Sequence, residues 1–252
     1  MELWQSGTVG ERTATVSEAP EPPGTYAGGY TLLADRSTLS REGVGTLRFK
    51  ILDDDGGTVR GFDMRHASRM HLVVVRRRDL SHYRHLYPAM SLDGTWSVPV
   101  ELTEAGIYGA VADCSIGGVR RTLLTGLLAE GSAEATPIPE PATTASVDGY
   151  EVRIEGPPPV AGVANRLEFH ISYGGQRIAE PDRHFIVPGH LVALRASDLA
   201  LFHGRPLDPA DAGLPALGFG LDLPTAGRYR LFLRFTYGGR ERAVGFTVEV
   251  PG

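Results

Sequence analysis

The sequence predicts an all-β protein made of two tandem immunoglobulin-like β-sandwich domains. Glycine and proline are abundant, with 32 and 18 copies among 252 residues, which argues against long helices. Short runs of β-branched and aromatic residues recur between turn signals, giving about seven strands per 100 residues. A cupredoxin-like sandwich would produce the same pattern, so both sandwich topologies stay open.

An internal repeat with an offset of about 120 residues gives the number of domains. The run LRFKI at 47–51 returns as LEFHI at 167–171, and HLVVVR at 71–76 returns as HLVALR at 190–195. Each repeat also contains a glycine doublet at the matching position, Gly117-Gly118 in the first and Gly238-Gly239 in the second. We therefore expect one β-sandwich at 28–131 and a second at 148–252.

Two segments outside the repeats have a different composition. Residues 132–147 are rich in proline, alanine and threonine, which predicts a semi-rigid linker. Residues 1–27 have similar character and are expected to be a flexible N-terminal segment.

Strands follow from local patterns within each copy. Leu47, Phe49 and Ile51 alternate with basic residues, which is typical of a half-buried strand. The run 70–76 is apolar on both faces and is therefore expected to be a central strand. The other expected strands are 30–34, 46–52, 96–102, 108–114, 229–235 and 245–250. The expected hairpin turns are Asp55-Gly56-Gly57, Asp93-Gly94, Gly117-Gly118 and Gly238-Gly239.

Composition excludes several classes of function. The net charge of −5 argues against a nucleic-acid partner, and no apolar run is long enough for a transmembrane segment. Cys114 is the single cysteine, so an internal disulfide and a thiolate metal cluster are excluded. No nucleophile elbow, phosphate loop or zinc-protease motif is found, so we expect no enzyme, no catalytic residues and no organic cofactor.

Histidine and methionine cluster in the first repeat. Four of the eight histidines and two of the four methionines fall within 64–85, and imidazole with thioether suits copper, above all Cu(I). Two histidines recur at matching positions in the second repeat. The candidate metal ligands are Met64, His66, Met70, His71, His82, His85, His190 and His203.

A structural role is the alternative for these residues. None of their spacings is diagnostic of a metal site, and a histidine at a strand end often bonds a loop carbonyl instead. The metal hypothesis predicts that the histidines converge. The alternative is a structural or protein-interaction module without metal, with histidines apart and an exposed apolar patch or open edge strand.

The runs MHLVVVRRRDLSHYRH at 70–85, DGTWSVPV at 93–100 and AGIY at 105–108 resemble actinobacterial tandem YtkA-like and FixH-like β-sandwich proteins. The counterparts at 189–199 and 226–235 extend the resemblance to the second repeat. It implies a secreted or membrane-anchored protein associated with copper or heavy metals.

Two positions depart from that family. A His-x-His-Pro motif follows the Asp-Leu turn in such relatives, whereas this chain has Tyr87 and Arg205 in place of the second histidine. Relatives also begin with a leader, and the start of this chain shows no signal-peptide pattern. The resemblance alone predicts an extracytoplasmic location. The oligomeric state is left open.

Overall fold

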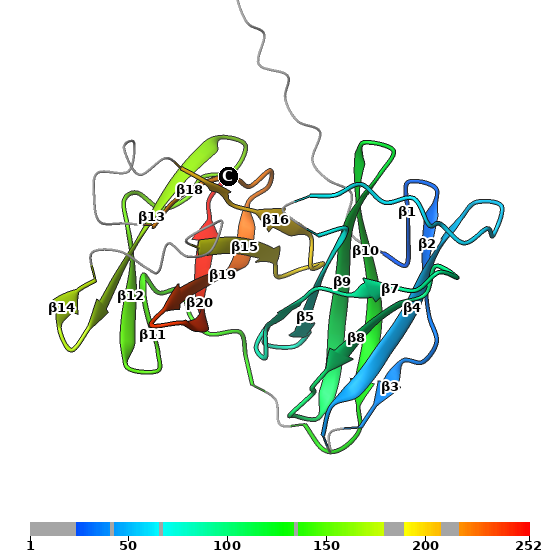
Figure 1. Ribbon diagram of the computed structural model, residues 1–252. Helices are drawn as coiled ribbons and strands as arrows, with labels where there is room; N and C mark the ends of the chain where they lie inside the picture. Colours follow the sequence, from blue (N-terminus) through cyan, green and yellow to red (C-terminus); the bar gives the residue numbers. More distant parts are fainter. Residues whose placement is uncertain (1–23, 41–42, 66–67, 134–135, 179–188, 208–216) are drawn as a thin grey trace, which may run out of the picture.

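The computed structural model describes residues 24–40, 43–65, 68–133, 136–178, 189–207 and 217–252. Every regular element among these residues is a β-strand, which confirms the predicted all-β class. Four sheets form two β-sandwiches that follow one another along the chain (Figure 1). Within the described residues, we find no helical segment with the length and apolar character needed to cross a membrane.

The first sandwich packs two five-stranded sheets face to face. The first sheet has the order β1-β2-β4-β8-β7, and the second has the order β3-β10-β9-β5-β6. Their bounds are β1 Tyr26–Ala27, β2 Tyr30–Ala34, β3 Thr38–Leu39, β4 Gly45–Asp53, β5 Met70–Arg76, β6 Arg84–Leu86, β7 Ala89–Met90, β8 Trp96–Val100, β9 Gly106–Ile116 and β10 Val119–Ala129.

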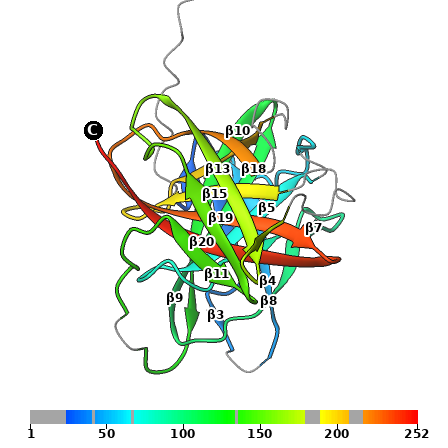
Figure 2. The ribbon, with the colours of Figure 1, turned by 90° about the vertical axis from the view of Figure 1, so that its left-hand side faces the viewer.

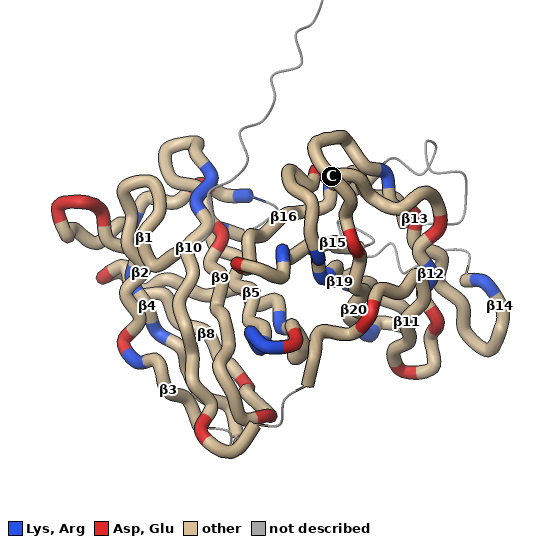
Figure 3. Tube along the Cα trace, turned by 180° about the vertical axis from the view of Figure 1, so that it is seen from behind, with Lys and Arg blue, Asp and Glu red and all other residues tan. Residues whose placement is uncertain are grey.

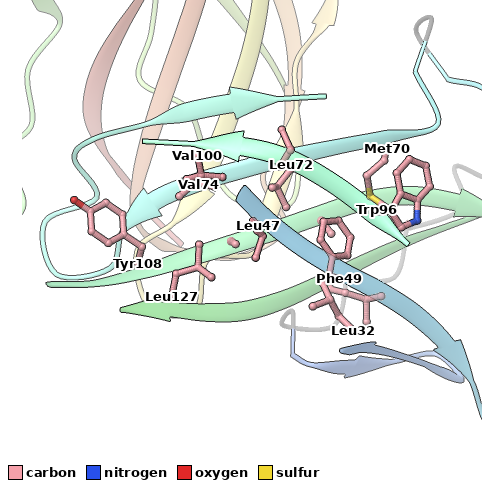
Figure 4. Close-up of a cluster of buried hydrophobic side chains, with 14 of the residues drawn as sticks. Leu32, Leu47, Phe49, Met70, Leu72, Val74, Trp96, Val100, Tyr108 and Leu127 are labelled. Carbon is pink, nitrogen blue, oxygen red and sulfur yellow. The ribbon is translucent and has the colours of Figure 1, made fainter. Parts of the chain in front are cut away.

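Alternation along the strands builds the core of this sandwich. Leu47, Phe49 and Ile51 of β4 are fully buried, while the basic residues between them face outward. They meet side chains of the opposite sheet, including Met70 and Leu72 of β5 (Figure 4). The period-two pattern therefore selects the inward face, as the sequence predicts.

The second sandwich also packs two sheets face to face, one with six strands and one with four. One sheet has the order β11-β12-β13-β18-β17, with β14 also paired to β13, and the other has the order β16-β15-β19-β20. Their bounds are β11 Thr144–Val147, β12 Tyr150–Glu155, β13 Ala164–Tyr173, β14 Gln176–Arg177, β15 Gly189–Arg195, β16 Leu201–His203, β17 Arg205–Pro206, β18 Leu217–Asp222, β19 Gly227–Tyr237 and β20 Arg240–Val250.

Glycine doublets close the longest hairpins. Gly117 and Gly118 join β9 to β10 with φ values of +59° and +79°, and Gly238 and Gly239 do the same between β19 and β20. Two consecutive positive φ angles match the twist of a two-residue hairpin, and glycine adopts them without steric cost.

Two predicted boundaries need correction. Strand β11 at Thr144–Val147 lies inside the predicted linker 132–147, because its backbone pairs with β12. Strand β1 at Tyr26–Ala27 lies inside the predicted flexible segment 1–27, and Gly24 bridges Leu123. Residues 1–23 lie outside the described residues.

The two sandwiches are packed against each other through β5 and β15. Val73 and Val75 of β5, together with Val192 and Leu194 of β15, point away from their own cores and form one buried apolar cluster. Tyr83 stacks on Phe232 across this interface, with ring centroids 4.1 Å apart and planes at 7°. Figure 2 shows β15 and β19 lying over β5.

This interface explains the run 70–76. The strand lies inside its sheet as predicted, between β9 and the three-residue strand β6. Its second face is apolar because the other sandwich covers it.

Candidate metal centre between the two sandwiches

Four histidines from both sandwiches meet in the interface. His71 lies in β5, and His85 in β6 is paired with Val73, two residues further along β5. The pleat therefore places both imidazoles on the outer face of the first sandwich. The second sandwich repeats the arrangement, because His203 in β16 is paired with Val192, two residues beyond His190 in β15.

The ring nitrogens approach to hydrogen-bonding distance. His71 Nδ1 lies 2.9 Å from His85 Nε2, and His203 Nδ1 lies 3.2 Å from His190 Nε2. One nitrogen from each of His71, His85 and His190 lies within 4.8 Å of the others. The ring of His203 stands 5.2 Å from that of His190 and 5.9 Å from that of His71.

These separations fit a first-row transition metal. Four nitrogens placed about 2.0 Å from a central ion in a tetrahedron lie about 3.3 Å from one another. The nitrogens in each of the two histidine pairs are slightly closer than that, so small outward shifts of the rings would open space for an ion. His71, His85 and His190 thus form a group that could hold a metal ion, and His203 lies beside His190 as a fourth imidazole.

Asp113 of β9 contacts one histidine of the cluster from outside it. His203 donates Nε2–H to Asp113 Oδ2 at 3.0 Å, and Arg120 donates to the other carboxylate oxygen at 2.6 Å. Burial alone would raise the pKa of Asp113, but the hydrogen bond from His203 and the charge of Arg120 lower it to about 2. An ionised carboxylate only accepts hydrogen bonds, so His203 donates through Nε2, and its Nδ1 faces His190 in the cluster.

On the opposite side of the cluster, the acidic and basic positions of this ion pair are exchanged. Arg234 of β19 and Glu241 of β20 are the repeat counterparts of Asp113 and Arg120, and they also form a cross-strand ion pair. Arg234 lies over the ring of Tyr87, which stacks on His85 at 5.1 Å. Burial, His190 and Arg234 lower the pKa of His85, so its imidazole is neutral and available as a ligand.

A small cavity borders the cluster. It has a volume of about 50 Å³ and is lined by His71, His203 and Asp113, among others. Cys114 also lines it, but burial raises the pKa of this thiol to about 12, so Cys114 stays a neutral, apolar-like side chain.

The structure brings together four of the eight predicted ligands and separates others. Met70 is fully buried in the first core beside Trp96 (Figure 4). Met64 is 61% exposed and does not line the cavity. His82 instead contacts Glu104 at 2.8 Å and Thr103 at 3.1 Å. His66 lies outside the described residues. The predicted cluster within the first domain is thus replaced by one that both domains share.

Sequence reasoning missed Asp113, Arg120 and Tyr87. One signal was available, because Asp113 is a lone carboxylate in an otherwise apolar strand, where an unpaired charge would be costly. Tyr87 packs its ring against His71 and His85, at 5.2 and 5.1 Å.

One protein family matches part of the chain. A model described as a domain of unknown function, DUF8832, matches residues 145–252. These residues carry all but the first residue of the strands of the second sandwich. A search of curated proteins finds no match. The resemblance to YtkA-like and FixH-like proteins therefore stays a prediction.

Several solved structures match the chain at low similarity. The adhesin FdeC of Escherichia coli is 11% identical, with 90% of this chain and 65% of that chain covered and a TM-score of 0.29. InvD of Yersinia pseudotuberculosis is 12% identical, with 89% and 58% covered and a TM-score of 0.29. Salmonella α-2-macroglobulin is 14% identical, with 93% and 15% covered and a TM-score of 0.31. The chain spans less than two thirds of each of these proteins.

Proposed function

We propose that this chain is a non-enzymatic binding protein that holds one divalent transition-metal ion between its two sandwiches. The observation that supports this most is the convergence of His71, His85, His190 and His203 from both domains. An extracytoplasmic location, which the sequence resemblance implies, is part of the proposal.

The donor set favours Zn²⁺ or Cu²⁺ over Cu(I). Imidazole suits zinc and divalent copper, whereas Cu(I) gains most from thioether and thiolate ligands. Met70 belongs to the core, and Met64 does not line the site. The proposal therefore replaces the histidine–methionine copper site with one made of imidazole alone.

Metal binding would join the sandwiches. Two ligands come from each domain, so an ion bound by all four stabilises the packed arrangement relative to separated domains. An ion present at about 100 times its Kd stabilises the binding-competent state by about 2.7 kcal/mol.

Titration of the metal-free protein with Zn²⁺ against a chromophoric chelator tests this function, and a parallel titration uses Cu²⁺. We expect one equivalent to bind with a Kd below about 1 µM. The double variant His85→Ala/His203→Ala removes one ligand from each domain and should weaken binding at least 100-fold. His82→Ala is the matched control and should bind as the parent does. Absence of competition with the chelator, or equal affinity in the double variant, would overturn the proposal.

A protein-interaction module is the second candidate, and one observation favours it. Strand β20 ends its sheet, and its outer edge accepts a hydrogen bond from Ala142 at Thr247. Its counterpart β10 is covered more fully, by β3 and by Gly24. An open edge can pair with a strand of another molecule.

Sedimentation of the metal-free protein at rising concentration tests strand pairing between copies. If copies pair along β20, the molar mass should increase with concentration. Ala243→Pro removes a backbone donor at this edge and should abolish the increase. A constant monomer mass would exclude pairing between copies. Neither result depends on the histidines, so the two candidate functions are tested separately.

A further inference from the structure

A second cleft lies between the sandwiches, away from the four-histidine cluster. It has a volume of about 430 Å³, and its walls come from the turn before β6, the start of the second sandwich, β19 and β20. Residues lining it include Arg84 of the first sandwich and Arg230, Phe232 and Gly245 of the second. The volume is within the usual range for small-molecule sites, about 300–1,000 Å³.

The two repeats differ at this place in a specific way. In the first sandwich, Gly109 of β9 leaves room for Leu199, because a Cβ at Gly109 would lie 2.3 Å from Leu199 Cδ1 and 3.3 Å from Leu124 Cδ1. The repeat counterpart of Gly109 is Arg230, and that of Leu124 is Gly245. At this place the first sandwich contributes apolar packing around Gly109, whereas the second sandwich contributes a cleft lined by Arg230.

Arg230 is buried without a carboxylate partner. The residue is 8% exposed, and none of the ion pairs among the described residues joins it to an aspartate or glutamate. One guanidinium nitrogen, Nη1, donates to Thr247 Oγ1 at 2.8 Å, and Nε has no hydrogen-bond partner. Burial lowers the pKa of Arg230, and the more distant charge of Asp79, which pairs with Arg76, raises it. A buried cation is normally paired, and no carboxylate among the described residues forms an ion pair with Arg230.

The absence of a side chain at Gly245 makes room for the guanidinium of Arg230. A Cβ at Gly245 would lie 2.7 Å from Arg230 Nη2 and 3.1 Å from the ring of Phe232. The guanidinium carbon also lies 5.4 Å from the centre of the Phe232 ring, which fixes its plane. The guanidinium therefore packs beside Gly245 and Phe232, both of which also line the cleft.

The acidic residues of the cleft already have basic partners. Asp148 lies 3.4 Å from Arg242 and 3.5 Å from Arg240, and Glu241 pairs with Arg234. Arg84 is exposed and donates to the carbonyl of Tyr83. The charge left without an acid therefore comes from Arg230 and Arg84. Figure 3 shows basic positions of β19 in the middle of the molecule.

We propose that this cleft binds a small organic carboxylate, with Arg230 as its principal contact and Arg84 as a second one at the rim. A guanidinium presents parallel N–H groups that match the two oxygens of a carboxylate, and the partly desolvated cleft strengthens such a pair. The site uses none of the four clustered histidines, so it is independent of the proposed metal function.

Calorimetric titration of the full chain with succinate tests this site. We expect saturable binding with a Kd of about 1 mM or tighter. Arg230→Gln should weaken it at least tenfold, because it removes the charge and keeps part of the volume. Arg228→Gln is the matched control, because Arg228 lies on the same strand, pairs with Glu249 and does not line the cleft. It should leave the affinity within twofold of the parent.

Two further arms make the result specific. Succinamide, which has the same skeleton without charge, should not bind, and tighter binding of inorganic phosphate than of succinate would overturn the carboxylate class. If Arg230→Gln fails to fold, the exposed variant Arg84→Ala decides, with at least a threefold loss expected. The Nε–H signal of Arg230 in nitrogen-15 NMR should also shift with succinate. A flat titration, or equal affinity in all variants, would overturn the site.

Discussion

His203 of the second sandwich donates its Nε2–H to Asp113 of the first at 3.0 Å. The bond crosses the interface between two repeats and places Nδ1 of His203 toward His190. A carboxylate behind a histidine in this way raises its basicity and fixes its orientation for a metal. The interface therefore contains a hydrogen-bonded polar cluster next to its buried apolar side chains.

Asp113→Asn tests this positioning role. The amide still accepts a hydrogen bond but no longer carries charge, so we expect about a tenfold rise in the Kd for Zn²⁺. Titration against a chelator measures it. Asp63→Asn is the control, because Asp63 bonds Ser115 on the same strand and lies outside the cluster. Equal affinity in both variants would show that Asp113 does not position a ligand.

Gly109→Ala tests the packing of the interface. The new Cβ would lie 2.3 Å from Leu199 Cδ1, and overpacking of this kind costs about 1–3 kcal/mol. We expect a lower Tm and, in small-angle scattering, a larger radius of gyration. Gly126→Ala on β10 is the control, because a Cβ added there would have no other atom within 4 Å. An unchanged Tm for Gly109→Ala would mean that the sandwiches separate readily.

Asp79 makes stability depend on acid pH. It is buried and accepts hydrogen bonds from Arg76 and Ser81, which together outweigh burial and lower its pKa to about 2. The unfolded value is about 3.9, so the contribution, about 2 kcal/mol, is present above pH 5 and is lost as pH falls toward 2. Urea unfolding should show that Asp79→Asn costs this amount at pH 7 and far less at pH 2.5.

The second sandwich supplies the matched variant for that measurement. Asp198 accepts hydrogen bonds from Arg195 in the same turn, and its side chain is 25% exposed compared with 3% for Asp79. We therefore expect a smaller loss for Asp198→Asn at pH 7. A larger loss for Asp198→Asn would contradict the argument from burial.

Met70→Leu separates the two versions of the metal hypothesis. Met70 packs in the first core, and a volume-conserving substitution should cost less than about 1.5 kcal/mol. The affinity for Zn²⁺ or Cu²⁺ should stay unchanged in this variant and in Met64→Ala. A loss of metal affinity in either variant would show that a methionine thioether is one of the ligands.

Local sequence patterns predicted most strands, because side-chain alternation and turn glycines act within one strand or hairpin. The predicted strands 30–34 and 70–76 match β2 and β5 at both ends. Strand β11 was missed, since Thr144–Val147 gains its strand conformation from pairing with β12 rather than from an apolar pattern.

The sequence by itself determined the sandwich class, the repeat and the matched pairs His71/His190 and His85/His203. These depend on alternation and on recurrence, both of which can be read along one chain. Only the tertiary structure decided that the pairs meet each other, that Met70 faces the core and that Arg230 faces a cleft. Each of these depends on which sheet face the other sandwich covers, and strand alternation alone does not specify that partner.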